Sequence, residues 1–148
     1  MSENDRTILV VDDDPDSRII AARLLERIGY RTATADGGAE CLRIVGTEHI
    51  DLILLDVMMP GMDGFAVCEA LRAAGHRIPI ILLTAKDDID TRLEGMHQGL
   101  SEFLTKPINK HELYARVRAQ LHILELDRQL AEVERNIRGA GRPPAPAK

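Results

Sequence analysis

Short apolar runs alternate along the chain with segments whose apolar residues recur every three or four positions. The runs have the length of β-strands and lie at 8–11, 31–35, 52–55, 79–83 and 102–105. The segments between and after them have helical spacing and lie at 18–28, 38–45, 65–74, 90–98 and from 109 to 138. The pattern therefore predicts five strands, each followed by a helix.

Strict alternation of strands and helices is typical of an α/β protein with a parallel sheet. Right-handed crossovers leave few possible topologies. We therefore expect a flavodoxin-like, doubly wound (βα)5 parallel sheet with the strand order 2-1-3-4-5, followed by an extended C-terminal helix. The strand at 52–55 is apolar on both faces, so we expect it at the centre of the sheet.

The chain is expected to divide into three parts. Residues 1–122 would form the α/β domain, residues 123–138 a helical extension, and residues 139–148 a disordered tail rich in Pro, Ala and Gly. Apolar residues three and four apart in alternation occupy the a and d positions of a coiled coil in the extension: Ile123, Leu126, Leu130, Val133 and Ile137. This spacing predicts a parallel homodimer. The alternatives are a helix that folds back on its own domain or frays, because two heptads are a short seam.

Composition limits the range of functions. The chain is 45% hydrophobic and 29% charged with a net charge of -5, so no basic patch indicates a nucleic-acid partner. The first apolar run is too short for a signal peptide or a membrane span, and we expect a cytoplasmic protein without a membrane partner. Cys41 and Cys68 lack metal-ligand spacing and are expected to be buried or half-buried thiols.

Polar side chains follow four of the strands. Asp12–Asp14 follow the first strand, Asp56 the third, Thr84 the fourth and Lys106 the fifth. Because the carboxyl ends of parallel strands share one edge of the sheet, we expect these groups to lie close together. Clustered carboxylates repel one another unless a cation compensates, and Mg²⁺ suits a site with carboxylates, waters and a phosphate. The pattern predicts a magnesium site.

Such a site favours phosphoryl transfer onto an aspartate. A carboxylate beside the cation can attack phosphorus, while the cation and Lys106 neutralise charge on the transferring group. Thr84 can donate a hydrogen bond to a phosphoryl oxygen, and no other cofactor is needed. Taken singly, two nearby acids have ordinary explanations: Asp14 and Asp63 are both typical helix N-caps.

Four segments of the chain together resemble the receiver domains of bacterial two-component response regulators. They are Ile8–Asp14, Asp51–Gly64, Leu83–Lys86 and Phe103–Pro107. The resemblance spans roughly residues 6 to 122. Each segment is a weak signal by itself, whereas the four in this order and spacing are specific.

The resemblance implies a role for each site residue. Asp56 is the implied phosphoacceptor, and Lys106 contacts the phosphate. The implied metal is Mg²⁺ or Mn²⁺. Its implied ligands are Asp56, Asp13 directly, Asp12 through a water molecule, and the carbonyl of Met58. Thr84 and Phe103 match the switch pair, and Lys106–Pro107 matches a cis peptide.

The resemblance also implies a signalling switch, not an enzyme with a separate substrate. A histidine kinase or histidine phosphotransfer protein would phosphorylate Asp56, and the change would alter a surface that binds a downstream protein. The chain would catalyse only its own phosphorylation and dephosphorylation. Two alternatives are an Asp-nucleophile phosphohydrolase, which typically has a second acid where this chain has Met58, and an adaptor that takes no phosphate.

Overall fold

A computed structural model of the chain describes residues 5–85 and 102–141. The strands in these ranges are β1 (Thr7–Val11), β2 (Arg31–Ala35), β3 (Leu52–Asp56), β4 (Ile80–Thr84) and β5 (Glu102–Thr105). They form one parallel sheet in the order β2-β1-β3-β4-β5. The predicted topology is confirmed, and β3 is the central strand.

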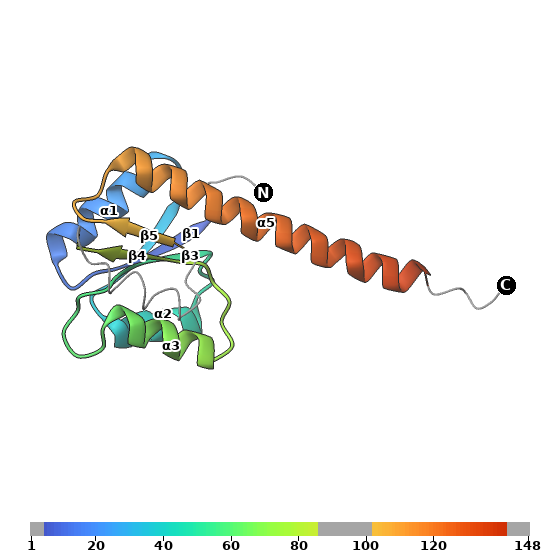
Figure 1. Cartoon of the computed structure of the whole chain (residues 1–148), viewed down its shortest axis with the longest axis horizontal. Helices are drawn as coiled ribbons and strands as arrows, with labels where there is room; N and C mark the ends of the chain where they lie inside the picture. The colour runs from blue at the N-terminus through green and yellow to red at the C-terminus, as the bar shows by residue number, and fades with distance from the viewer. Residues whose placement is uncertain (1–4, 86–101, 142–148) are drawn as a thin grey trace.

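Helices cover both faces of the sheet. They are α1 (Pro15–Arg27), α2 (Gly38–Thr47), α3 (Gly64–Ala73) and α5 (Lys110–Gly141). In Figure 1, α1 and α5 lie on one face and α2 and α3 on the other. The helix predicted at 90–98 lies outside the described residues. None of the described helices has a stretch long and apolar enough to cross a membrane, although α5 has 32 residues.

Side-chain caps set the start of several helices. Asp14 caps α1, because its carboxylate accepts hydrogen bonds from the amide and hydroxyl of Ser17 at 3.3 and 2.7 Å. The helix therefore begins at Pro15, earlier than its apolar spacing alone predicted. Asp63 likewise caps α3, as expected. Beyond the end of α1, Gly29 has a φ of 103°, a conformation that favours glycine.

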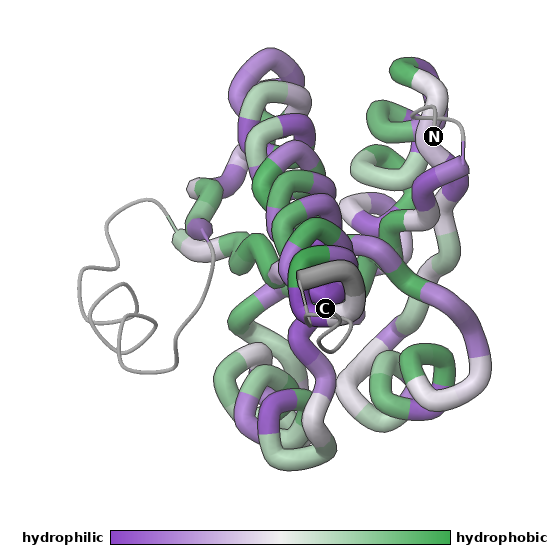
Figure 2. Tube along the Cα trace, turned by 90° about the vertical axis from the view of Figure 1, so that its right-hand side faces the viewer, coloured by the Kyte–Doolittle hydropathy of each residue, from purple (hydrophilic) through white to green (hydrophobic). Residues whose placement is uncertain are grey.

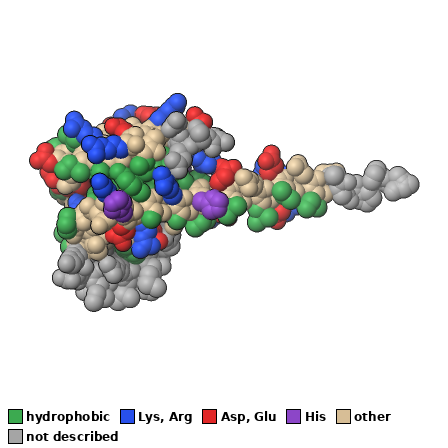
Figure 3. All heavy atoms as spheres, turned by 90° about the horizontal axis from the view of Figure 1, so that it is seen from above, with side chains coloured by type: hydrophobic (Ala, Val, Ile, Leu, Met, Phe, Trp, Pro, Cys, Tyr) green, Lys and Arg blue, Asp and Glu red, His purple; other side chains and the backbone are tan. Residues whose placement is uncertain are grey.

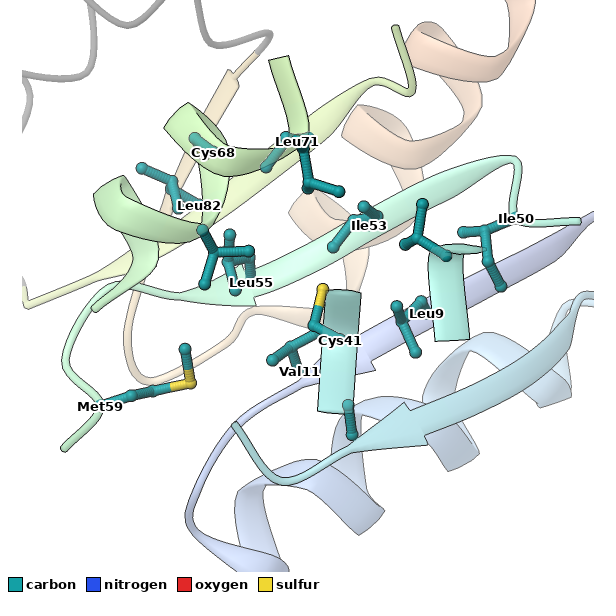
Figure 4. Close-up of a cluster of buried hydrophobic side chains, with 14 of the residues drawn as sticks. Leu9, Val11, Cys41, Ile50, Ile53, Leu55, Met59, Cys68, Leu71 and Leu82 are labelled. Carbon is teal, nitrogen blue, oxygen red and sulfur yellow. The ribbon is translucent and has the colours of Figure 1, made fainter. Parts of the chain in front are cut away.

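Strand side chains alternate between two cores, one on each face of the sheet. The core beneath α2 and α3 includes the strand residues Leu9, Val11, Ile53, Leu55, Ile80 and Leu82 (Figure 4). The core beneath α1 and α5 includes Ile8, Val10, Leu52, Leu54, Ile81 and Leu83. Each of these side chains is at most 1% exposed, and full burial of one is worth about 1.5–3 kcal/mol. Strands buried on both faces hold the sheet rigid below the site.

Both cysteines belong to the core beneath α2 and α3. Cys41 on α2 and Cys68 on α3 are fully buried, as the sequence predicted (Figure 4). Burial raises the pKa of each thiol to about 12, because desolvation disfavours the thiolate. Neither thiol is therefore a reactive group, and both act as small apolar side chains.

The last helix is packed on the domain well past the boundary predicted at His122. Leu124 packs against the core beneath α1 and α5, and Glu125 pairs with Arg6 at 2.7 Å. Arg128 approaches Asp51 at 3.7 Å. The boundary remains a prediction, but these contacts continue through Arg128.

The remainder of α5 projects beyond the sheet as a single rod (Figure 1). The helix ends at Gly141 rather than at residue 138. Residues 139–141, predicted as the start of a disordered tail, are therefore helical. Residues 142–148 lie outside the described residues.

Candidate functional site

Three aspartates meet at the carboxyl edge of the sheet. β1 and β3 are neighbours with Val11 opposite Leu55, so Asp12 and Asp56 leave their strands side by side. Carboxylate oxygens of Asp12, Asp13 and Asp56 all lie within 4.8 Å of one another. Asp12 is 1% exposed and Asp56 5% exposed, whereas Asp13 is exposed. The sequence-predicted acidic cluster therefore forms, with two buried members and one open to solvent.

Lys106 bridges the two buried acids. Its Nζ lies 3.1 Å from Oδ2 of Asp12 and 3.2 Å from Oδ2 of Asp56. The backbone amide of Lys106 donates a 2.8 Å hydrogen bond to the carbonyl of Thr84, which ties the end of β5 to the end of β4. The next peptide bond, Lys106–Pro107, is cis, in agreement with the resemblance. One cation thus sits between two carboxylates at a fixed place.

Burial is the largest electrostatic influence on Asp56, and the charge of Lys106 is the next. Desolvation raises the pKa of Asp56 to about 6, the charge of Lys106 opposes that rise, and the charge of Asp12 adds to it. Desolvation acts against the charged form of Lys106. Its hydrogen bond to Asp12 and the charge of Asp56 outweigh that effect and raise its pKa. One lysine does not fully compensate the acids, so the site favours an additional cation.

The loop after β3 closes back on Asp56. The amide of Val57 donates to the carbonyl of Leu83 at 3.1 Å, and the amide of Gly64 donates to the carbonyl of Val57 at 2.9 Å. A Cβ atom on Gly64 would lie 2.8 Å from the backbone oxygen of Asp56, too close for any other residue without a backbone shift. The amide of Met58 points at Oδ1 of Asp56, at 3.3 Å.

Backbone and arginine contacts hold Asp12. Its Oδ1 accepts a hydrogen bond from the amide of Asp14 at 3.0 Å, and its carbonyl accepts one from the guanidinium of Arg18 at 2.8 Å. Sequence reasoning missed Arg18 and Gly64 as supporting residues. Gly64 carried a signal, a glycine after Asp63 at the end of a loop. Arg18 carried none, because nothing distinguishes it from the other arginines of the chain.

Thr84 and Phe103 lie on neighbouring strands on one side of the sheet. Phe103 is opposite Leu82 in the register, and Thr84 is two residues beyond Leu82. Thr84 is 2% exposed, and its hydroxyl donates to the carbonyl of Ala85 at 3.1 Å. Phe103 is half-buried against the core beneath α2 and α3. The structure brings Thr84 to the acidic edge, with its hydroxyl bonded to backbone.

An open cleft of about 650 Å³ leads to the site. Asp56 and Lys106 line it together with apolar side chains, among them Ile20, Met58 and Pro107. Met58 is 70% exposed and Ile20 57% exposed. The cleft therefore leads to Asp56 and Lys106 past an apolar rim. Lys86, the last residue of the segment Leu83–Lys86, lies outside the described residues.

The sequence of this chain matches a known family. The model of the response regulator receiver domain matches residues 8–118. The protein named "Probable transcriptional regulator ycf27" from Cyanophora paradoxa is 44% identical over 125 residues, which cover 84% of this chain and 52% of that protein. Response regulator MprA from Mycobacterium ulcerans is 42% identical over 120 residues, 81% of this chain and 52% of that protein. The chain thus spans about half the length of these curated relatives.

Solved structures with the same fold cover most of the chain. Chemotaxis protein CheY4 of Vibrio cholerae superposes with a TM-score of 0.73 at 31% identity, covering 77% of this chain and 97% of that one. A putative response regulator from Chloroflexus aurantiacus superposes with a TM-score of 0.74 at 33% identity, covering 79% and 98%. Both similarities agree with the order of the sheet and with the two helical layers.

Proposed function

Because this chain belongs to the response regulator receiver family, we propose that it is a switch that accepts a phosphoryl group on Asp56. The observation that carries the proposal is the bridging position of Lys106, within 3.2 Å of both Asp12 and Asp56. A buried carboxylate beside a fixed ammonium, at the end of an open cleft, is suited to phosphoryl transfer. Family membership also implies a histidine kinase as partner.

The proposed reaction moves one phosphoryl group. A carboxylate oxygen of Asp56 attacks the phosphorus of a phosphohistidine on a histidine kinase or histidine phosphotransfer protein. The phosphorus–nitrogen bond breaks, its electron pair returns to the imidazole, and an acyl phosphate forms on Asp56. Lys106 already faces Oδ2 of Asp56, so its charge is in place to offset the negative charge of the incoming group. The chain then acts as a signalling switch and has no separate substrate.

The acidic cluster fits a hard divalent cation. Asp12, Asp13 and Asp56 supply carboxylate oxygens, and we assign the carbonyl of Met58 as a further protein ligand. When bound, Mg²⁺ or Mn²⁺ supplies charge neutralisation for the acids and for the oxygens of a phosphoryl group. The donor set contains oxygen only, which suits these ions better than zinc or copper.

Thr84 and Phe103 form the proposed switch. A phosphoryl group on Asp56 offers the Thr84 hydroxyl a stronger, charged acceptor than the Ala85 carbonyl that it contacts in this structure. Movement of Thr84 toward the phosphate frees space into which Phe103 can turn. The effect is a local hydrogen bond that biases a two-state element, and the output surface would include β5 and α5.

The output partner is proposed to be a protein. One relative is named a transcriptional regulator, which points to DNA as a target of that protein. This name conflicts with the expectation of no nucleic-acid partner. We therefore limit that expectation to the receiver segment and do not extend it to a longer protein that contains it.

Labelling with acetyl phosphate and Mg²⁺, followed by intact mass measurement, tests the proposal. We expect the wild-type chain to gain one phosphoryl group and Asp56→Asn to gain none. Asp36→Asn is the matched control, because Asp36 follows β2 at the same edge and is exposed. Labelling of Asp56→Asn to the wild-type level would refute the assignment. Continuous release of phosphate would indicate a phosphohydrolase, and no reaction would indicate an adaptor.

A further inference from the structure

Two separate apolar stripes run along α5. The first consists of Leu113, Val117 and Leu121, which are buried against the sheet. The second begins at Ile123. A helix turns by about 100° per residue, so Ile123 lies about 200° around the axis from Leu121. The second stripe is therefore a surface on the opposite side of the helix and does not continue the core.

The second stripe is exposed along its whole length. Its members are between 49% and 63% exposed: Ile123, Leu126, Leu130, Val133 and Ile137. Figure 2 looks along α5 from its C-terminal end and shows apolar and polar residues alternating along it. In Figure 3 apolar side chains line the projecting part of the helix beside acidic ones. Five large apolar side chains on one exposed stripe indicate a surface made for a partner.

The described residues of the domain, 5–85 and 102–122, do not cover this stripe. With Ile123 and Leu130 at a and Leu126 at d, Leu124 falls at position b and Arg128 at position f. Leu124 packs on the core, and Arg128 approaches Asp51 on the domain. The side of α5 that contacts its own domain is therefore the side opposite the second stripe. Among the described residues α5 does not fold back, and the five side chains of the stripe stay exposed.

We propose that a second copy of this chain covers the stripe, as a two-stranded parallel coiled coil. The stripe alternates steps of three and four residues over about two heptads, which is the self-complementary pattern of a coiled-coil seam. Ile123 and Ile137 at a, with Leu126 at d, favour two parallel strands, whereas Leu130 at a and Val133 at d do not follow this preference. A globular partner would not require this strict spacing.

The charges beside the seam favour the parallel orientation. In a parallel pair each g residue faces the following e residue of the other helix, so His122 meets the partner's Asp127 and Gln129 meets the partner's Glu134. These pairs are complementary or neutral. In an antiparallel pair e faces e, and Asp127 would meet the partner's Glu134, two acids in contact. Like-charge contacts of this kind select against the alternative arrangement.

A parallel pair places both domains at the same end of the coiled coil. Each domain holds its own helix through Arg6–Glu125 and Asp51–Arg128, just where the seam begins. The two domains are therefore connected to the seam without a flexible joint. This inference does not depend on phosphorylation of Asp56, since it rests on α5 alone.

Sedimentation equilibrium of the full chain over a range of concentrations tests the pairing. We expect a reversible monomer–dimer equilibrium for the wild type and a monomer at every concentration for Leu126→Gln/Leu130→Gln. The matched control, Glu132→Gln/Arg135→Gln, changes exposed residues off the seam and should dimerise as the wild type does. Acetyl phosphate labelling of both variants should be unchanged. A wild type that is monomeric at high concentration, or a dimer that survives the seam substitutions, would overturn the proposal.

Disulfide trapping tests the orientation. In a parallel pair residue 133 faces its own copy across the seam, so Val133→Cys should form a covalent dimer on mild oxidation. Glu132→Cys, one residue away and off the seam, should cross-link at least tenfold less. The wild type controls for Cys41 and Cys68, which are buried. A wild type that dimerises while Val133→Cys fails to cross-link would overturn the parallel arrangement.

Discussion

Arg6 and Glu125 form a 2.7 Å ion pair across nearly the whole length of the chain. Arg6 precedes β1 and is 7% exposed at its side chain, and it also lies 3.6 Å from Asp51, which is buried. The pair fixes α5 to the base of the sheet, at the end opposite the acidic cluster. Glu125 lies beyond the domain boundary predicted at His122, so a chain truncated at that boundary lacks this ion pair.

We expect a chain stopped after His122 to be less stable than one stopped after Gln129. The shorter chain loses Leu124, whose packing is worth about 1 kcal/mol, and it leaves the buried Arg6 guanidinium without Glu125. Urea unfolding followed by circular dichroism measures the difference. Equal midpoints for both chains would show that the contacts after His122 contribute nothing to stability.

Substitution of the phosphoacceptor should stabilise the metal-free domain. Asp56 has a folded-state pKa of about 6, above its ordinary 3.8, so its ionisation costs stability as pH rises through this window. Asp56→Asn removes that cost, and we expect a gain of about 1 to 3 kcal/mol at neutral pH in the presence of EDTA. The gain should shrink on acidification to about pH 4. A gain that does not change with pH would contradict the electrostatic explanation.

Magnesium should stabilise the wild type through Asp13. This residue is the exposed member of the cluster, so its loss leaves the packing of Asp12 and Asp56 intact. We expect Mg²⁺ to raise the wild-type Tm and to raise that of Asp13→Ala much less. Asp36→Asn should respond as the wild type does. A full magnesium response in Asp13→Ala would remove Asp13 from the ligand set.

Gly64 should be intolerant of any side chain. The added methyl of Gly64→Ala would meet the backbone of Asp56 and Val57 at 2.8 and 2.9 Å, and overpacking of this kind costs about 1–3 kcal/mol. The shift would also displace Asp56, so labelling by acetyl phosphate should slow. Gly46→Ala is the control, since nothing lies within 4 Å of its added methyl. Wild-type stability and labelling in Gly64→Ala would disprove the close approach.

Met58 should prolong the phosphorylated state. Hydrolysis of an acyl phosphate requires a water placed in line with phosphorus, and the Met58 side chain lines the cleft without a group that orients water. We expect Met58→Asn to lose phosphate faster than the wild type, by roughly tenfold for an added positioning contact of about 1.4 kcal/mol. The rate of phosphate loss is measured by mass spectrometry, as the fraction of phosphorylated protein that remains at successive times after the phosphodonor is removed. Slower decay in the variant would contradict this role.

The order of apolar and polar residues by itself predicted the fold and the edge of the sheet at which the candidate site residues lie. Strands apolar on both faces, such as Leu52–Leu55, must be buried between two layers, and an acid after such a strand must emerge at the carboxyl edge. Asp12, Asp56 and Lys106 therefore lie at the same edge of the sheet, where the structure brings them into contact. The spacing of apolar residues is a local property of the chain, so a single sequence is enough to identify it.

Only the tertiary structure decided how distant residues pair. Arg6 with Glu125, Arg18 with the carbonyl of Asp12, and Gly64 against Asp56 depend on distances set by the packed sheet and helices. The exposure of the second stripe of α5 was also decided by the tertiary structure. The spacing of Ile123 and Leu126 marks an apolar stripe, but which side of the helix rests on the domain follows from the contacts of Leu124 and Arg128. Burial is a property of the whole fold, because a side chain is shielded from solvent by residues that are distant in the sequence and come close only when the chain folds.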